Sequence, residues 1–277
     1  MALARIVKSP KALTGLVLVS SMVLLAVLAP WIAPYDPLAL DPVASNQAPS
    51  AEYWLGTDFF GRDVLSRMIW GARPSLLIGF ASVFIGCIIG SLIGVTAGYF
   101  RGWVDAVLMR PVDVLLSFPI VVLALAMVAA LGPSLINLIL TISLLFVPRF
   151  ARVVRGEAMA LRELDYVEAA RACGQRPFAI IMRHVLPNAT AQIIVTCTVF
   201  MANAILVEAG LSFLGVGVTP PEPSWGNMLA DGRNNILGAP WLTTFPGLML
   251  TLTLVGFNLL GDALRDILDP RLRGLHN

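Results

Sequence analysis

The amino-acid sequence predicts an all-α integral membrane protein with six transmembrane helices. Hydrophobic residues make up 57% of the 277 residues and charged residues only 13%, with a mean hydropathy of +0.82, which is far from the composition of a soluble domain. Six apolar runs approach the roughly 20 residues that a helix needs to cross about 30 Å of hydrocarbon. The basic residues gather on one side of these runs, as they do in cytoplasmic loops of membrane proteins.

The six apolar runs make residues 1–277 a single transmembrane domain. In chain order they are Ala12–Ile32, Ser75–Tyr99, Val114–Leu131, 134–150, Ala189–Val207 and Trp241–Leu260. The fourth run is strongly apolar only as far as Val147. It crosses the membrane if the helix extends through Phe150 and if Arg149 snorkels to the interface.

The first run has an alternative interpretation as a secretory signal peptide, because Arg5, Lys8 and Lys11 precede it. It is longer than the roughly 7–15-residue apolar core of a signal peptide, and Pro30 and Pro34 lie where a cleavage site would be. We therefore expect an uncleaved first transmembrane helix.

The distribution of lysine and arginine predicts the orientation in the membrane. With the N-terminus inside, fifteen basic residues face the cytoplasm and four arginines face the outside. The positive-inside rule therefore places both termini in the cytoplasm, together with a loop at 149–187 that carries seven arginines. Segments 33–74 and 208–240 are then outer loops, rich in proline and glycine.

A short segment before the second run has the pattern of an amphipathic helix. Within Gly61–Arg73, one helical face carries Val64, Leu65, Met68 and Ile69. We expect this segment to lie as a separate helix in the outer membrane interface.

Four glycines recur every four residues in the second run, at Gly86, Gly90, Gly94 and Gly98. Such a stripe of small residues lets another helix backbone approach closely, which drives helix packing in lipid. We expect the stripe to pack on a neighbouring helix of the same chain. Packing on a second membrane subunit is the alternative.

Motifs for enzymatic chemistry are missing from the sequence. The only two lysines, Lys8 and Lys11, do not follow a glycine, so no phosphate-binding P-loop is present. The two histidines and three cysteines are scattered and form neither a zinc pattern nor a disulfide framework. We therefore expect no catalytic residue, no metal and no cofactor in this chain.

Few ionisable side chains fall inside the apolar runs, which argues against a self-sufficient ion-coupled carrier. The uncharged Asn203 and the acidic Glu208, in and just beyond the fifth run, are the candidates for lining a translocation path. The alternative for Glu208 is a helix end that simply meets water.

The loop at 149–187 contains a short helix with both ends marked in the sequence. Asp165 and Glu168 have the spacing of a capping box at its N-terminus. Gly174, with Pro177 three residues later, marks its C-terminus. Because a short, firmly ended helix on a basic loop is suited to binding a soluble partner, we expect transport to be driven by a protein outside this chain.

This helix resembles the EAA loop of the membrane subunits of binding-protein-dependent ABC importers. Glu168-Ala169-Ala170 is followed after three residues by Gly174 and then by a helical stretch that ends at Leu186-Pro187. His184 departs from the general pattern, which has isoleucine there. The ending from His184 to Asn188 is nevertheless similar to the peptide and nickel branch of the family.

Other segments resemble the C-type permeases of that branch across nearly the whole chain. Each is short, and their order and spacing together carry the resemblance. They are Trp54–Asp58, Gly61–Arg67, Leu211–Gly215, Ser224–Gly226, Phe257–Asp262 and Leu264–Asp266.

The resemblance implies the type I ABC importer permease fold and a place in the lipid bilayer of the bacterial cytoplasmic (inner) membrane. It implies a second homologous permease, two cytoplasmic ATPase subunits that hold ATP and Mg²⁺, and an extracytoplasmic solute-binding protein, with no nucleic acid. It places the coupling to an ATPase on Asp165, Tyr166, Glu168, Ala169, Ala170, Cys173 and Gly174. The implied cargo is a di- or oligopeptide. The alternatives are nickel or a metal chelate and, further away, a stand-alone carrier or channel.

Overall fold

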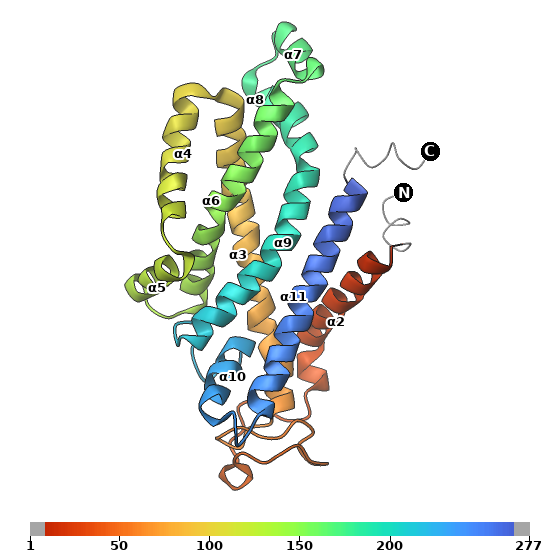
Figure 1. Ribbon diagram of the computed structural model, residues 1–277, viewed down its shortest axis with the longest axis vertical. Coiled ribbons are helices and arrows are strands. Elements are labelled where there is room, and N and C mark those ends of the chain that lie inside the picture. Colours follow the sequence, from red (N-terminus) through yellow and green to blue (C-terminus); the bar gives the residue numbers. More distant parts are fainter. Residues whose placement is uncertain (1–8, 269–277) are drawn as a thin grey trace.

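The computed structural model describes residues 9–268, and this part of the chain is almost entirely helical (Figure 1). Within these residues no strand forms, and the pairing of Thr57 with Asp63 is an isolated bridge. The α-helices are α2 (Pro10–Ile32), α3 (Val64–Phe100), α4 (Gly102–Ser117), α5 (Ile120–Leu131), α6 (Leu135–Arg162), α7 (Asp165–Ala172), α8 (Pro177–Ile180), α9 (Leu186–Phe213), α10 (Trp225–Gly232) and α11 (Trp241–Leu268). Short turns η1 (Pro42–Ala44), η2 (Ile181–Val185) and η3 (Arg233–Asn235) complete the set. The prediction of an all-α fold is confirmed.

Among the described residues, five helical stretches are long and apolar enough to cross a membrane: α2, α3, α6, the run from α8 to α9, and α11. A sixth crossing forms if α4 and α5 are counted as one span, although these helices are bent by 97°. The predicted span Val114–Leu131 is therefore divided between two helices, and its crossing of the membrane stays a prediction. The backbone of Phe118 is extended, as expected for a residue before a proline, and the chain turns there before Pro119.

Helix α3 begins earlier than its apolar run. Asp63 is the N-cap, and its carboxylate accepts hydrogen bonds from the backbone N–H of Ser66 at 2.7 Å and from the Ser66 hydroxyl at 2.6 Å. The predicted interfacial helix at 61–73 is thus wrong, because its residues form the first turns of α3. The apolar face that suggested it is buried, with Val64 and Met68 in the protein core.

Helix α6 continues past the end of its apolar run as far as Arg162. The predicted loop at 149–187 is therefore helical in its first third. The reason is the buried face of α6, where Phe150, Ala151, Val154 and Ala158 follow one another at helical spacing and are fully buried. The arginines between them lie on the other faces of the helix and leave the buried face apolar.

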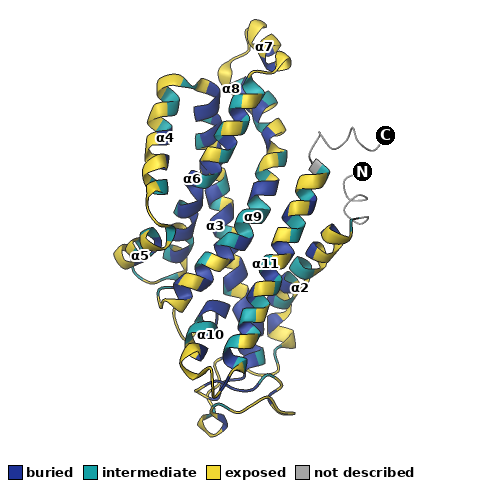
Figure 2. Ribbon diagram, in the orientation of Figure 1, coloured by how far each residue is buried: buried dark blue, intermediate teal, exposed yellow. Residues whose placement is uncertain are grey.

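The glycine stripe of α3 packs on α6, as predicted for a helix of the same chain. A methyl group built on Gly90 would lie 2.5 Å from the carbonyl oxygen of Val147 and 2.6 Å from Cβ of Phe150. A methyl on Gly98 would lie 2.5 Å from the carbonyl oxygen of Arg155. Only glycine allows this approach, and the resulting seam is buried along its length (Figure 2).

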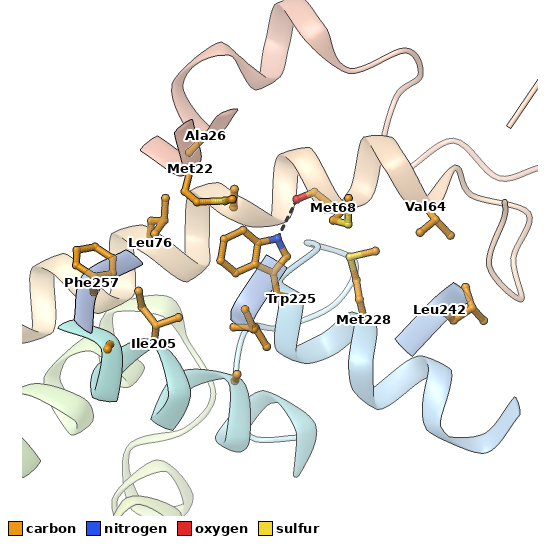
Figure 3. Packing of buried hydrophobic residues seen from close by; sticks show 14 of the residues in the cluster. Met22, Ala26, Val64, Met68, Leu76, Ile205, Trp225, Met228, Leu242 and Phe257 are labelled. Carbon is orange, nitrogen blue, oxygen red and sulfur yellow. Dashed lines mark hydrogen bonds between the residues drawn. The ribbon is translucent and has the colours of Figure 1, made fainter. Parts of the chain in front are cut away.

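A second core joins α2, α3, α9, α10 and α11 around Trp225, which is fully buried (Figure 3). The indole Nε1 of Trp225 donates a hydrogen bond to the carbonyl oxygen of Met68 at 3.0 Å. On the outside of α2, apolar residues such as Val17, Leu24 and Val27 are more than half exposed, as expected for helix faces that meet lipid.

The molecule is elongated, with α7 at one end and α10 and the segment between α2 and α3 at the other (Figure 1). The start of α2 and the end of α11 both lie on the side of the molecule toward α7. The described ends of the chain are thus on one side, as predicted. Their location in the cytoplasm stays a prediction.

Candidate functional site

Helix α7 is the short helix that the sequence predicted, but its N-terminus differs from the prediction. The N-cap is Leu164, and Asp165 is the first helical residue, without a side-chain hydrogen bond to the backbone. The N–H of Glu168 bonds to the carbonyl of Leu164 at 3.2 Å. The predicted capping box is therefore wrong. Both carboxylates still lie in the first turn, where negative charge stabilises the helix dipole.

The C-terminus of α7 is the one predicted. Gly174 has a φ of +74°, a conformation that favours glycine. Its N–H bonds to the carbonyl of Arg171 at 3.0 Å, and the N–H of Gln175 bonds to the carbonyl of Ala170 at 3.2 Å. These two bonds form a Schellman motif, which ends the helix firmly. A Cβ on Gly174 would meet nothing within 4 Å, so the backbone conformation alone requires glycine.

One face of α7 packs on the membrane helices. Val167 and Ala170 are buried in a cluster with Val95 and Tyr99 of α3 and with residues of α6, α8 and η2. The family resemblance implied that Ala170 is one of a set of residues that contact an ATPase. In the structure Ala170 is 7% exposed and packs against its own chain instead. The other residues of that set, which a partner could reach, are Asp165, Tyr166, Glu168, Ala169, Cys173 and Gly174, all exposed.

Arginines at the base of α7 hold it to the rest of the chain. Arg162 Nη1 donates a hydrogen bond to the carbonyl oxygen of Tyr99 at 2.8 Å. The guanidinium groups of Arg162 and Arg171 lie 5.9 and 6.0 Å from the centre of the Tyr99 ring. No local pattern predicted that Tyr99 is the residue on which α3, α6 and α7 meet.

Three ion pairs join neighbouring helices beside α7. Arg155 binds Asp105 through two hydrogen bonds, of 2.5 and 2.6 Å, and so joins α6 to α4. The other two pairs are Arg101 with Glu163 at 3.0 Å and Arg152 with Asp113 at 2.7 Å. Several arginines that were predicted only as part of a basic loop therefore form ion pairs with other residues of this chain.

The two residues predicted to line a translocation path lie in different environments. Asn203 is half-buried, and its amide donates to the carbonyl oxygen of Val199 at 2.9 Å. Glu208 is 0% exposed, and Ser212 Oγ donates to its Oε1 at 2.7 Å. The alternative, in which Glu208 meets water at a helix end, is wrong because α9 continues to Phe213. In this conformation Glu208 does not line an open path either.

The end of the molecule opposite α7 contains a buried ion cluster that sequence reasoning missed. Arg62 Nε binds Asp58 at 2.6 Å, and Arg67 lies 3.5 Å from the same carboxylate. Both arginines also face the exposed Asp231 of α10, at 3.7 and 3.9 Å, and Arg67 donates to the carbonyl oxygen of Pro37. Partial desolvation raises the pKa of Asp231 above its ordinary value, while Arg67 and Arg62 act in the opposite direction.

A cavity of about 500 Å³ opens beside this cluster. Exposed apolar side chains, Phe59, Phe60 and Leu214, lie in its wall together with Arg233. Apolar side chains exposed on loops outside the membrane helices are typical of protein-binding surfaces.

Among the described residues, no group of three histidine, cysteine, aspartate or glutamate side chains lies close enough to hold a metal ion.

Comparison with protein families gives two matches. Residues 90–274 match the binding-protein-dependent transport system inner membrane component family. Residues 1–49 match the N-terminal transmembrane domain of oligopeptide transport permease C.

Several curated proteins are similar over nearly their whole length. The dipeptide transport system permease protein DppC of Alkalihalophilus pseudofirmus is 44% identical, over 96% of this chain and 88% of that protein. A putative peptide transport system permease protein of Brucella suis is 47% identical, over 94% and 87%. The glutathione transport system permease protein GsiD of Escherichia coli O6:K15:H31 is 42% identical, over 95% and 87%.

Among solved structures, the MetNI methionine ABC transporter in an inward-facing conformation is similar to this fold. The TM-score is 0.61 at 21% identity, over 73% of this chain and 96% of that chain. At this identity the likeness concerns the fold alone, and it agrees with the predicted permease architecture. The family match over residues 90–274 and the permeases at 42–47% identity show that this chain is a multi-pass transport permease of the binding-protein-dependent transport system inner membrane component family.

Proposed function

We propose that the chain is one of two permease subunits of an ATP-driven importer for di- and oligopeptides in the bacterial cytoplasmic membrane. The observation that carries the proposal is α7, a helix fixed to the membrane helices on one face and exposed on the other. The peptide, dipeptide and glutathione permeases among its relatives favour a peptide cargo over nickel or a metal chelate.

In this proposal α7 is the coupling helix. Its eight residues are about 12 Å long, which suits a single groove on a partner protein. Asp165, Tyr166, Glu168, Ala169 and Cys173 would contact a cytoplasmic ATPase subunit, and Gly174 would keep the helix end intact under load. ATP and Mg²⁺ would be held by two such ATPase subunits, and this chain would supply no catalytic group.

The energy of ATP would reach the membrane helices through the buried face of α7. Val167 and Ala170 pack against Tyr99, and the α3–α6 seam follows directly from there. Because tightly packed helices move together, a shift of α7 would move α3 and α6 as one unit. A second, homologous permease would complete the path, and the two subunits would alternate between inward and outward access.

At the opposite end, a solute-binding protein would deliver the peptide. Segments 33–63 and 214–240 supply the surface, with Phe59, Phe60 and Leu214 exposed around the cavity. Asn203, on the partly exposed side of α9, stays the candidate for contact with the cargo.

The test is a charge reversal on the exposed face of α7. In the importer reconstituted with its ATPase subunits, Glu168→Arg is expected to weaken ATPase association and peptide uptake together. Glu222→Arg, an equal change at an exposed residue of the opposite end, is expected to leave ATPase association intact. Normal association and uptake in the Glu168→Arg complex would refute the role of α7.

A further inference from the structure

Helix α10 is anchored by a buried polar cluster that the proposed function does not use. We call it the α10 anchor: Glu208 and Ser212 of α9, Ser75 of α3, and Ser224 and Trp225 at the N-terminus of α10. All five residues are buried. Figure 3 shows Trp225 of this cluster between α3 and α9, with its indole bonded to Met68.

One hydrogen bond of the α10 anchor joins α3 to α10, and the others lie within α9 and between α9 and the loop that follows it. Ser212 Oγ donates to Glu208 Oε1 at 2.7 Å and accepts from the N–H of Val218 at 3.3 Å. Ser75 Oγ accepts from the N–H of Trp225 at 3.4 Å. Ser75 and Ser224 lie beside the carboxyl group of Glu208.

The backbone of α10 sits directly on α9 at this point. A methyl group on Gly226 would lie 2.6 Å from Cβ of Ser212 and 2.7 Å from Cα of Ala209. These close contacts leave no room for a small displacement, so α10 either packs on α9 here or separates from it.

Glu208 is an expensive residue to place here. It is fully buried, and its Oε2 atom has no hydrogen-bond partner. An apolar side chain of similar volume would fill the same space without the desolvation cost of a carboxyl group. Packing alone therefore does not account for Glu208, and the polar groups beside its carboxyl include Ser224 at the start of α10 and Ser75 of α3.

We propose that Glu208 is a positioning residue that holds α10 on α3 and α9 while the end opposite α7 is closed, and that outward opening draws α10 off this anchor. The proposal rests on the alternating-access function above. It assigns Glu208 to coupling and not to contact with the cargo.

Removing the anchor should let α10 leave its seat without a binding protein. Glu208→Ala removes the carboxyl group beside Ser224 of α10 and Ser75 of α3. The loss of one such hydrogen-bonding contact corresponds to about a threefold to tenfold shift in the equilibrium between seated and unseated α10. ATP hydrolysis without binding protein should rise by the same factor. Glu208→Gln keeps the shape and one acceptor oxygen and should stay close to wild type.

The experiment uses the complete importer in lipid nanodiscs and has two readouts. The first is ATP hydrolysis without binding protein in Glu208→Ala, Glu208→Gln and the exposed control Asp266→Ala, near the end of α11. The second is labelling of Met228→Cys by an impermeant maleimide, with the three native cysteines replaced by alanine. Met228 lies on the buried face of α10, so its labelling reports departure of α10 and needs neither cargo nor ATP.

The proposal predicts that both readouts rise in Glu208→Ala and stay low in Glu208→Gln and Asp266→Ala. Unchanged hydrolysis and labelling in an assembled Glu208→Ala complex would overturn it, as would an equal rise in the glutamine variant. If Glu208→Ala fails to assemble, Ser75→Ala removes the acceptor of Trp225 N–H and must give the same pattern. A wild-type complex that lacks peptide-stimulated hydrolysis would instead count against the proposed function, while the labelling readout would still decide the role of Glu208.

Discussion

A single methyl group placed in the α3–α6 seam should separate the two helices. In Gly90→Ala, Cβ would lie 2.5 Å from the carbonyl oxygen of Val147, 2.6 Å from Cβ of Phe150 and 3.0 Å from the N atom of Ala151. Ordinary contacts between such atoms are about 3.5–4.0 Å, so the seam must open by roughly 1 Å. Two of these three atoms belong to the α6 backbone and cannot turn away as a side chain would.

The expected cost of this overpacking is about 1–3 kcal/mol. The control is Gly156→Ala on α6, where the added methyl meets nothing within 4 Å. Because alanine favours helix over glycine by up to about 1 kcal/mol, the control should be neutral or stabilising. The assay is thermal unfolding of both purified variants in the same detergent. Equal midpoints for Gly90→Ala and Gly156→Ala would refute the glycine-seam reasoning.

Three further predictions concern single contacts. Asp58→Ala leaves two buried arginines without their main partner and should lower the free energy of unfolding by about 3–5 kcal/mol. Asp113→Ala breaks an exposed pair and should lower it by less than about 1 kcal/mol. Similar midpoints of the two variants in thermal unfolding would contradict this. Gly174→Ala forces alanine into a left-handed backbone conformation at a cost of about 1–2 kcal/mol. Association with the ATPase should therefore fall. Unchanged association would show that the C-terminus of α7 is not needed for ATPase binding. Trp225→Phe keeps the packing but loses the hydrogen bond to Met68, which should lower the free energy of unfolding by about 0.5–1.5 kcal/mol. An unchanged midpoint in thermal unfolding would mean that this hydrogen bond contributes nothing to stability.

Apolar runs predicted the membrane helices but not where those helices end. A hydropathy run stops at its first charges, whereas helical hydrogen bonding continues as long as one face stays buried. For this reason α3 starts at Val64 and α6 continues to Arg162, both well beyond their apolar runs. Pro119 indicated the bend between α4 and α5. The bend was not predicted because the run around Pro119 is predominantly apolar.

The coupling segment could be predicted in part for a similar reason. A glycine with φ of +74° is a local requirement, so Gly174 was identifiable from the chain alone. The residue at which a helix begins depends on the local backbone conformation, which several neighbouring residues can adopt. The N-cap of α7 is Leu164, so the predicted capping box at Asp165 was wrong. The burial of Ala170 and Glu208 results from contacts with distant helices, which no local pattern encodes. For the ion cluster, only the four-residue spacing of Asp58 and Arg62 gave a local sign.

The central claim is that the exposed face of α7 binds a cytoplasmic ATPase subunit. Cys173 is exposed at the end of α7, while Cys87 and Cys197 are half-buried within the helical core. The measurement is photo-crosslinking from Cys173 in native membranes, with the other two cysteines replaced and the crosslinked protein identified by mass spectrometry. The account predicts a crosslink to a P-loop ATPase that disappears in Glu168→Arg. Crosslinks to lipid alone, or to a protein without a P-loop, would contradict it.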